Sequence, residues 1–248
     1  MIYILFPTTG EAEPFLDLMD DRIPARFADE FVGRPGYAGI VAGSRVTTLI
    51  CGVGQASAAQ SATSVIESGH ASMLVMCGCA GAYAGSGLQV GDVAVATGEV
   101  YADLGVLTTD GFHALDNIGV PTNIQLDAGH YDEVFLASCS DGLKAGRTGG
   151  MRPPGVFKGA FLTVSTVSGT RARGDELFRR HAALCENMEG AAAAQVAALY
   201  GVSFMEVRGI SNMVVDRDRG SWDVQTASAN CALVVECLIR RVGGGEGD

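Results

Sequence analysis

Short apolar runs rich in β-branched residues alternate along this chain with longer segments of helical composition, and this alternation limits the possible folds more than any other feature. Strands separated by helical segments favour a sheet that is covered by helices on both faces. The run at 73–77 is apolar at every position, as expected for a strand buried on both sides. We therefore predict an α/β fold, a three-layer αβα sandwich around a central twisted mixed β-sheet.

The same alternation assigns an element to most of the chain. Strands are predicted at 2–7, 46–51, 73–77, 92–100, 157–165 and 203–210. Helices are predicted at 11–19, 55–68, 131–139, 190–200 and 224–241. A Gly- and Asp-rich loop is expected at 101–126. No linker divides the chain, so residues 1–242 are expected to form one domain, followed by a flexible tail at 243–248.

Charge and hydropathy exclude two classes of partner. The formal net charge of −11 at pH 7 repels phosphate backbones, so nucleic acid is not expected as a partner. No apolar stretch approaches the length of a membrane span, and the short apolar N-terminal run lacks the basic region of a signal peptide. We therefore expect neither a membrane partner nor an exported protein.

The cysteines and histidines do not form a metal-binding pattern. Seven cysteines, most of them inside apolar runs, are typical of reduced thiols in a cytoplasmic protein. Cys77 and Cys79 lack the two-residue gap and the further ligands of a zinc site, and the four histidines show no ligand spacing. We expect no metal and no cofactor.

Carboxylates follow the first predicted strand, at the edge where ligands bind in open α/β sheets. Glu11 and Glu13 lie at a predicted helix start. Acidic residues are favoured in a first helical turn by the helix dipole, which explains either residue alone. Either is also suited to act as a general base that activates water.

Small residues follow the next two predicted strands. Gly52 and Gly54 lie between a predicted strand and a predicted helix. The helix N-terminus there can bind an anion or a water, although a tight turn with no ligand explains the two glycines equally well. The third glycine of a dinucleotide-binding fingerprint is missing. Cys79, Ala80 and Gly81 would let a flat ligand approach the backbone, although close strand–helix packing explains them equally well.

Two polar clusters follow later strands. Asn187, Met188 and Glu189 combine a carboxylate suited to sugar hydroxyls with a thioether suited to a base or sugar face, although core packing also explains the methionine. Arg208 and Asn212 bracket the end of an apolar strand, and the amide suits the O6/N7 edge of a 6-oxopurine. The charged run at 216–219 is expected to be mostly solvated.

In order and spacing, these segments resemble the nucleoside phosphorylase and nucleosidase superfamily over essentially the whole chain. Its hydrolase branch, typified by methylthioadenosine/S-adenosylhomocysteine nucleosidase, has an early Glu-x-Glu, a Gly-rich turn, a small-residue segment, a Met-Glu pair and an Arg-x-Ile-Ser-Asp motif. The matching segments here are Glu11-Ala12-Glu13, Gly52-Val53-Gly54, Gly78-Cys79-Ala80-Gly81 with Val90-Gly91-Asp92, Met188-Glu189 and Arg208-Gly209-Ile210-Ser211-Asn212.

The resemblance implies a role for each matching residue. Glu13 would activate the attacking water, Glu189 would hold the ribose hydroxyls with Met188 against the sugar, and the small-residue segment would line the pocket. The family aspartate that protonates the purine is Asn212 here. An amide cannot deliver a proton but can bind hypoxanthine, as the asparagine of 6-oxopurine phosphorylases does. Asp216 and Asp218 remain open as sources of the missing acid.

Further segments resemble the futalosine hydrolases of an alternative menaquinone pathway. These are Pro7-Thr8 with the glutamates, 101–105, the segment 164–170 with candidate residues Ser165 and Thr166, and 187–190. This resemblance implies hydrolysis of the N-glycosidic bond of futalosine to hypoxanthine and dehypoxanthine futalosine. A nucleoside and water would be the partners of a cytoplasmic homo-oligomer.

Three alternatives stay open: a methylthioadenosine/S-adenosylhomocysteine-type nucleosidase, a purine nucleoside phosphorylase and a non-catalytic nucleoside-binding module. The phosphorylases of the family place arginines beside the Gly-rich turn and before the small-residue segment. Here only Arg45 lies near that turn in the sequence, and no arginine precedes Gly78 in its strand. The pattern therefore favours water over phosphate as the nucleophile.

Overall fold

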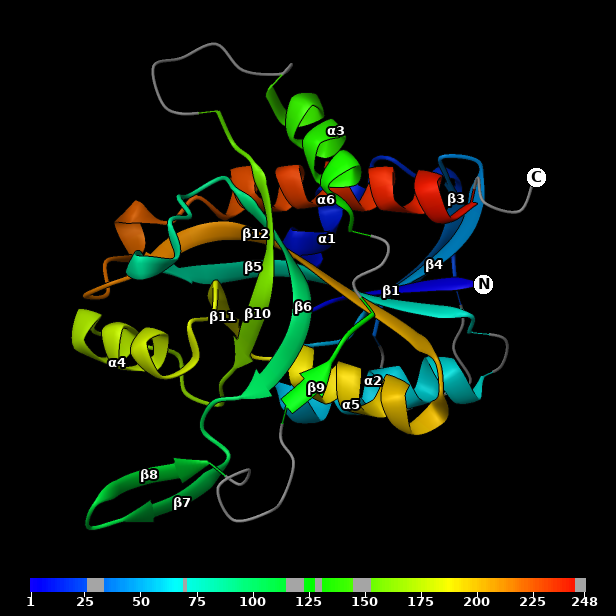
Figure 1. Ribbon diagram of the computed structural model, residues 1–248. Coiled ribbons are helices and arrows are strands. Elements are labelled where there is room, and N and C mark those ends of the chain that lie inside the picture. The colour runs from blue at the N-terminus through cyan, green and yellow to red at the C-terminus, as the bar shows by residue number, and fades with distance from the viewer. Residues whose placement is uncertain (26–33, 69–70, 115–122, 128–130, 145–152, 244–248) are drawn as a thin grey trace.

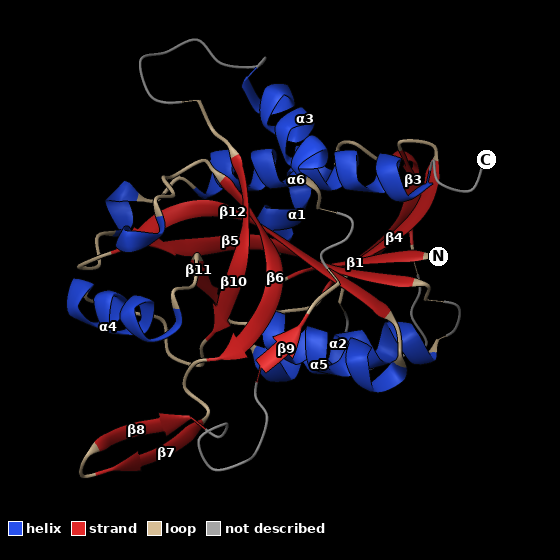
Figure 2. Cartoon of the chain, viewed as in Figure 1, coloured by secondary structure: helices blue, strands red, loops and turns tan. Residues whose placement is uncertain are grey.

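The computed structural model describes residues 1–25, 34–68, 71–114, 123–127, 131–144 and 153–243. Within them a ten-stranded mixed sheet runs through the molecule, with helices packed on both of its faces (Figures 1 and 2). The predicted α/β fold with a central mixed sheet is confirmed.

The strands differ in length and in depth of burial. In chain order they are β1 (Ile2–Phe6), β2 (Asp20–Pro24), β3 (Gly36–Val41), β4 (Ser44–Ile50), β5 (Met73–Tyr83), β6 (Val93–Tyr101), β7 (Gly105–Thr108), β8 (Gly111–Ala114), β9 (Asn123–Gln125), β10 (Val156–Thr163), β11 (Cys185–Asn187) and β12 (Ser203–Val214). The large sheet has the order β11-β10-β6-β12-β5-β1-β4-β3-β2, with β9 paired to β6. β7 and β8 form a separate hairpin that projects from the sheet (Figure 1).

Six α-helices are described: α1 (Thr9–Leu16), α2 (Gln55–Glu67), α3 (Glu133–Lys144), α4 (Arg171–His181), α5 (Gly190–Tyr200) and α6 (Val224–Gly243). Figure 1 shows α1, α3 and α6 on one face of the sheet and α2 and α5 on the other, while α4 lies at one end. Among the described helices, none is long and apolar enough to cross a membrane.

Each face of the sheet has its own apolar core. On one face, Phe15 of α1 and Leu238 of α6 pack with Phe6 and Val75 of the sheet. On the other face, alanines of α2 and α5 pack against Leu5 and Met76. Alanine side chains let these two helices lie close to each other and to the strands, which explains the Ala-rich composition of α5.

Two central strands are longer than predicted, and this difference builds the site. The small-residue segment after Cys77 continues β5 through Tyr83, and β12 continues past Ile210 to Val214. The register of β12 against β5 shifts between Ile210 and Asn212, as in a β-bulge. A bulge re-aims the side chains that follow it, so the chain keeps its strand pairing while Asn212 is redirected.

β11 closes this part of the sheet on itself. It pairs parallel with β10 and antiparallel with β5, so β5, β12, β6, β10 and β11 form a closed ring of strands. This pairing places Cys185 and Glu186 of β11 beside Ala82 and Gly81 of β5.

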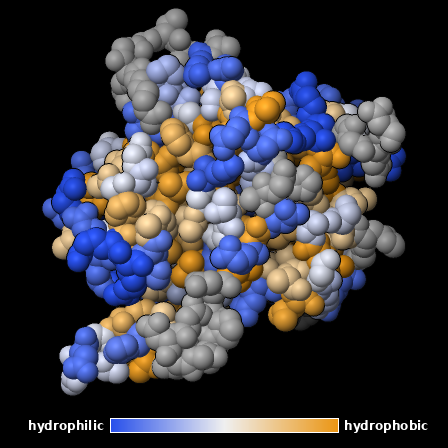
Figure 3. Space-filling model, viewed as in Figure 1, coloured by the Kyte–Doolittle hydropathy of each residue, from blue (hydrophilic) through white to orange (hydrophobic). Residues whose placement is uncertain are grey.

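Several predicted boundaries were wrong. The segment predicted as a loop at 101–126 contains the β7–β8 hairpin and β9 among its described residues. The sequence patterns did not indicate β2, β3, β11 or α4. Helix α4 forms a hydrophilic patch on the surface (Figure 3) and buries only Gly174 and Leu177, so it lacks an apolar stripe. Gly243 ends α6, and the rest of the predicted tail lies outside the described residues.

Candidate active site

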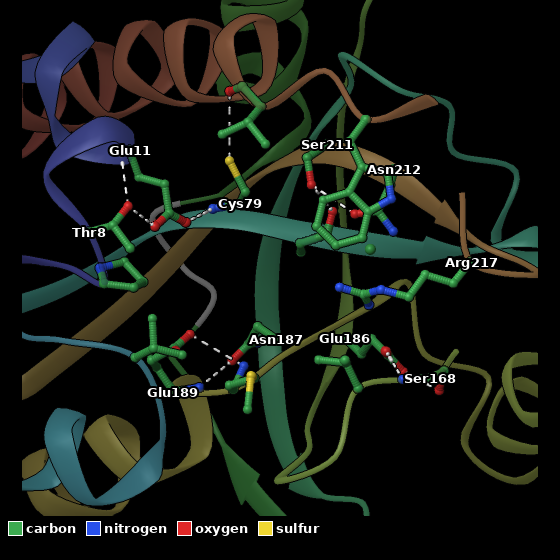
Figure 4. A pocket seen from close by; sticks show the side chains of 18 residues that line it. Thr8, Glu11, Cys79, Ser168, Glu186, Asn187, Glu189, Ser211, Asn212 and Arg217 are labelled. Carbon is green, nitrogen blue, oxygen red and sulfur yellow. Dashed lines mark hydrogen bonds between the residues drawn. The ribbon is translucent and has the colours of Figure 1, made fainter. Parts of the chain in front are cut away.

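A cavity of about 410 Å³ lies beside β5, β11 and β12. Eighteen residues from distant parts of the chain line it (Figure 4). They are Pro7, Thr8, Glu11, Val53, Cys79, Ala80, Gly81, Val167, Ser168, Glu186, Asn187, Met188, Glu189, Ser211, Asn212, Arg217, Trp222 and Val224. The cavity thus contains Cys79, Ala80, Gly81, Asn187, Met188, Glu189, Asn212 and Glu11 of the predicted site residues.

Both carboxylate oxygens of Glu11 are held in place. The Thr8 hydroxyl caps α1 by accepting the backbone N–H of Glu11 at 3.3 Å, and it donates to Oε2 of Glu11 at 2.6 Å. The backbone N–H of Cys79 donates to Oε1 at 2.8 Å. A side chain fixed by a helix cap and a strand amide is preorganised to hold a small polar molecule such as water.

Gly78 allows this close approach between α1 and β5. Its φ is +152°, and a Cβ there would lie 2.9 Å from Oε1 of Glu11 and 2.8 Å from Nη1 of Arg208. No larger residue fits without moving both charged groups, so glycine is required by space as well as by backbone conformation.

Glu13 lies outside the cavity, contrary to its predicted role. It is exposed, whereas Ala12 and Phe15 face the core and Glu11 faces the cavity. The helical period explains the difference, because residues two apart on a helix point in very different directions. Of the two carboxylates, only Glu11 can meet a ligand in the cavity.

Glu189 is a buried carboxylate that bridges two segments. Its Oε1 accepts the backbone N–H of Gly54 at 2.8 Å, at the N-terminus of α2. Its Oε2 lies 3.3 Å from Nη2 of Arg208. Gly52, with a φ of +83°, makes the turn that aims this amide but does not itself line the cavity. The helix N-terminus and the arginine both stabilise the negative charge.

Asn187 fixes the backbone around Glu189. Its Oδ1 accepts the N–H groups of Glu189 and Gly190, both at 2.8 Å, and so satisfies free amides at the start of α5. Met188 is thereby held at the cavity wall.

Arg208 lies behind the cavity in a fully buried network. Its Nε donates to Glu206 Oε1 at 2.7 Å, and its Nη1 donates to the carbonyl oxygen of Cys79 at 3.3 Å. Glu99, also fully buried, accepts from the Thr163 hydroxyl at 3.1 Å. Burial, together with the charge of Glu206, raises the pKa of Glu99 well above its usual value. The raised pKa favours the neutral form of Glu99, which competes less with Glu206 for the positive charge of Arg208.

The opposite side of the cavity carries Asn212, Arg217, Glu186 and Ser168 (Figure 4). The Ser211 hydroxyl donates to Asn212 Oδ1 at 2.9 Å. The guanidinium of Arg217 stacks on the Trp222 ring, 4.8 Å from its centroid. This side therefore offers an amide and a cation beside the carboxylate of Glu186, whereas the Glu11 side offers carboxylates and no cation among the described lining residues.

Glu186 is held by three donors. The backbone N–H and the hydroxyl of Ser168 each donate at 2.7 Å, and the Tyr83 hydroxyl donates at 2.9 Å. Burial and the nearby carboxylate raise the pKa of Tyr83, so its proton stays on the phenol. Glu186 fixes the loop after β10 against β11.

Besides Glu13, Gly52 and Arg208, three further predicted residues lie outside the cavity lining. The backbone N–H groups of Ser165 and Thr166 donate to Asp103 at 2.6 and 3.2 Å, so this pair shapes the loop before Ser168. Asp218 is exposed and accepts the Gly220 N–H at 2.9 Å as a local cap.

Arg217 and Trp222 were missed because their segment has the composition of a solvated loop. A single tryptophan close to an arginine was the available indication, since such pairs stack.

A second arginine was also missed. Arg34, not Arg45, lies beside the Gly-rich turn, where it donates to Ser61 Oγ at 2.6 Å and to the Ser57 carbonyl at 3.2 Å. It does not line the cavity. Within the described part of the chain, no group of three or more His, Cys, Asp and Glu side chains is arranged to hold a metal ion.

The chain is similar to known proteins over most of its length. The family model described as the phosphorylase superfamily matches residues 2–242. The futalosine hydrolase of Acidothermus cellulolyticus is 36% identical over 180 residues, which cover 72% of this chain and 69% of that protein. The 5'-methylthioadenosine/S-adenosylhomocysteine nucleosidase of Halalkalibacterium halodurans is 30% identical over 210 residues, covering 84% and 85%.

A solved structure shows the same fold. The 5'-methylthioadenosine/S-adenosylhomocysteine nucleosidase from Neisseria meningitidis, in complex with methylthio-immucillin-A, superposes with a TM-score of 0.76. The match covers 96% of this chain and 98% of that chain at 21% sequence identity.

Proposed function

The chain belongs to the phosphorylase superfamily and is an N-glycosidic bond hydrolase, and we propose that it hydrolyses futalosine to hypoxanthine and dehypoxanthine futalosine. One observation carries this proposal: a single cavity combines a fixed carboxylate, Glu11, with an amide, Asn212, on its opposite side. The carboxylate suits activation of water, and the amide suits a 6-oxopurine.

Glu11 is the general base in this proposal, in place of Glu13. It takes a proton from the water that attacks the anomeric carbon as the glycosidic bond breaks. Its two fixed oxygens support this role, because an oriented base needs no reorganisation during the reaction.

Glu189 and Met188 bind the ribose. A carboxylate accepts two hydroxyl hydrogens, and the buried Glu189 offers that capacity at the cavity wall. Positive charge develops on the sugar as the bond lengthens, so two nearby carboxylates favour the transition state over the ground state.

Water, not phosphate, is the proposed nucleophile. The N-terminal amide of α2 that would attract a phosphate already binds Glu189. Arg34 beside it is engaged by serine oxygens. Among the described lining residues the one cationic side chain is Arg217, on the side opposite Glu11. A phosphate would meet carboxylates where a phosphorylase needs cations.

We also propose that the protein is a cytoplasmic homo-oligomer. All seven cysteines are free thiols, as expected in a reducing compartment. Exposed apolar side chains, Val106 and Leu107 on the β7–β8 hairpin and Leu199 at the end of α5, favour association with a second copy. Size-exclusion chromatography with light scattering tests this part, and a monomer at micromolar concentration contradicts it.

The direct test of the substrate is base release from futalosine, inosine and methylthioadenosine, each with and without phosphate. We expect hypoxanthine from futalosine at a rate independent of phosphate. Adenine from methylthioadenosine alone would assign the chain to the sister hydrolase. Phosphate-dependent turnover would make it a phosphorylase, and purine binding without turnover would make it a binding module.

A further inference from the structure

Asn212 leaves the reaction without an obvious way to neutralise the departing base. When the bond between the anomeric carbon and the purine nitrogen breaks, its electron pair moves into the purine ring and makes the base an anion. An amide can donate a hydrogen bond to that anion but cannot give it a proton. The described lining on this side contains no free acid, because Glu186 already receives three donated hydrogen bonds.

Arg217 supplies the missing positive charge. We propose that its guanidinium faces the departing 6-oxopurine and stabilises the negative charge that develops on it, in place of a general acid. The inference rests on the proposed function, because it assumes that a purine occupies the Asn212 side of the cavity.

The placement of Arg217 supports this role. In Figure 4 its guanidinium points toward the middle of the cavity, and in this view it lies between Asn212 and the Glu186–Ser168 pair. Stacking on Trp222 orients the side chain, and the Arg217 backbone N–H donates to the Gly169 carbonyl at 3.1 Å. That hydrogen bond joins the segment of Arg217 to the loop that carries Ser168, so these two parts of the cavity lining are held together.

Arg217 is exposed in the unliganded protein, and its charge is therefore screened by water. A bound purine would displace part of that water, and the same charge then acts at a lower effective dielectric. The stabilisation would thus appear where the substrate is bound and the charge develops, which raises kcat more than it lowers KM.

The proposed step balances without a further reactant. The glycosidic carbon–nitrogen bond breaks with its electron pair on the purine, and the water oxygen bonds to the anomeric carbon. One water proton passes to Glu11, and the purine anion beside Arg217 is later protonated from solvent or from Glu11.

The test compares Arg217→Gln and Arg217→Lys with Arg219→Gln, a matched control in the same exposed loop that does not line the cavity. Two substrates are used: futalosine and its 6-thio analogue, whose base ionises at lower pH. We expect Arg217→Gln to lower kcat for futalosine roughly 100-fold, as for the loss of one electrostatic donor. The loss should be smaller for the analogue, smaller for the lysine variant and absent in the control.

Three outcomes would overturn the inference. These are unchanged kcat in Arg217→Gln, equal losses on both substrates, and an effect confined to KM, which would assign Arg217 to the carboxylate tail of the substrate. Matching circular dichroism and melting temperatures show that the variants are folded. If the wild-type protein does not hydrolyse futalosine, the proposed function fails first, and the same variants are then compared on whichever purine nucleoside is cleaved.

Discussion

The backbone N–H of Cys79 donates to Oε1 of Glu11 at 2.8 Å, and this hydrogen bond joins α1 to the part of β5 that follows Cys77. It distinguishes Glu11 from Glu13, the glutamate to which the sequence resemblance assigned the attacking water. Glu11 is turned toward the sheet and the cavity, whereas Glu13 faces solvent. The Glu-x-Glu motif therefore contains one side chain that lines the cavity and one that is exposed to solvent.

The two glutamates are expected to respond differently to the same conservative change. Glu11→Gln should lower kcat by about a hundred- to ten-thousandfold, because an amide cannot take a proton from water. Glu13→Gln should leave kcat within twofold. Steady-state hydrolysis of futalosine measures both, and the assignment fails if Glu13→Gln is the impaired variant.

A single methyl group at Gly78 is expected to disturb both the site and the fold. The added Cβ would lie under 3 Å from Glu11 and from Arg208, at a backbone φ of +152°. Gly78→Ala should lower the free energy of unfolding by about 1–3 kcal/mol, the usual cost of overpacking, and also lower kcat. Gly142→Ala in α3 is the control, since nothing lies within 4 Å of its Cβ position. Equal urea midpoints for wild type and Gly78→Ala would contradict this account.

Glu99 is expected to make stability fall as pH rises. Burial and Glu206 raise the pKa of Glu99 above 4.5, so the folded protein keeps a proton that the unfolded chain loses above that pH. Folding then takes up a proton and is weakened with rising pH, by at most about 1.4 kcal/mol per pH unit. Glu99→Gln has no such proton. Urea denaturation from pH 5 to 8 should show the variant gaining stability relative to wild type, and a constant difference would contradict a protonated Glu99.

Asn212→Asp is expected to change which base is released. An aspartate at this position can protonate a purine, as the resemblance to the nucleosidase branch implies for its own aspartate. Adenine release from methylthioadenosine should rise by about a hundredfold, the lower range of acid catalysis, while hypoxanthine release from futalosine falls. Chromatography of both bases measures the change, and no gain of adenine release would show that the amide does not set base preference.

Most of the layered fold follows from apolar patterning. The continuous apolar run of β5 and the alanines of α5 each specify one buried element. Helix α4 was not predictable in this way, because it buries only Gly174 and Leu177 and is stabilised by caps such as the Thr170 hydroxyl. A helix with so few buried apolar residues cannot be recognised from apolar periodicity in the sequence.

The site was predictable by segment but less so by residue. Motif order identified Glu189 and Asn212, whose side chains do line the cavity. It assigned the general base to Glu13, whereas Glu11 lines the cavity, because the direction of each side chain depends on where α1 begins and therefore on the cap at Thr8. Arg217 escaped notice because only the tertiary contact with Trp222 distinguishes it from other loop charges.

Activation of water by Glu11 for cleavage of the glycosidic bond of futalosine is tested most directly by turnover in oxygen-18 water with phosphate present. We expect hypoxanthine without label and a sugar product with one labelled oxygen at its anomeric carbon, formed by wild type and nearly abolished in Glu11→Gln. An unlabelled sugar 1-phosphate, or undiminished labelling in Glu11→Gln, would contradict it.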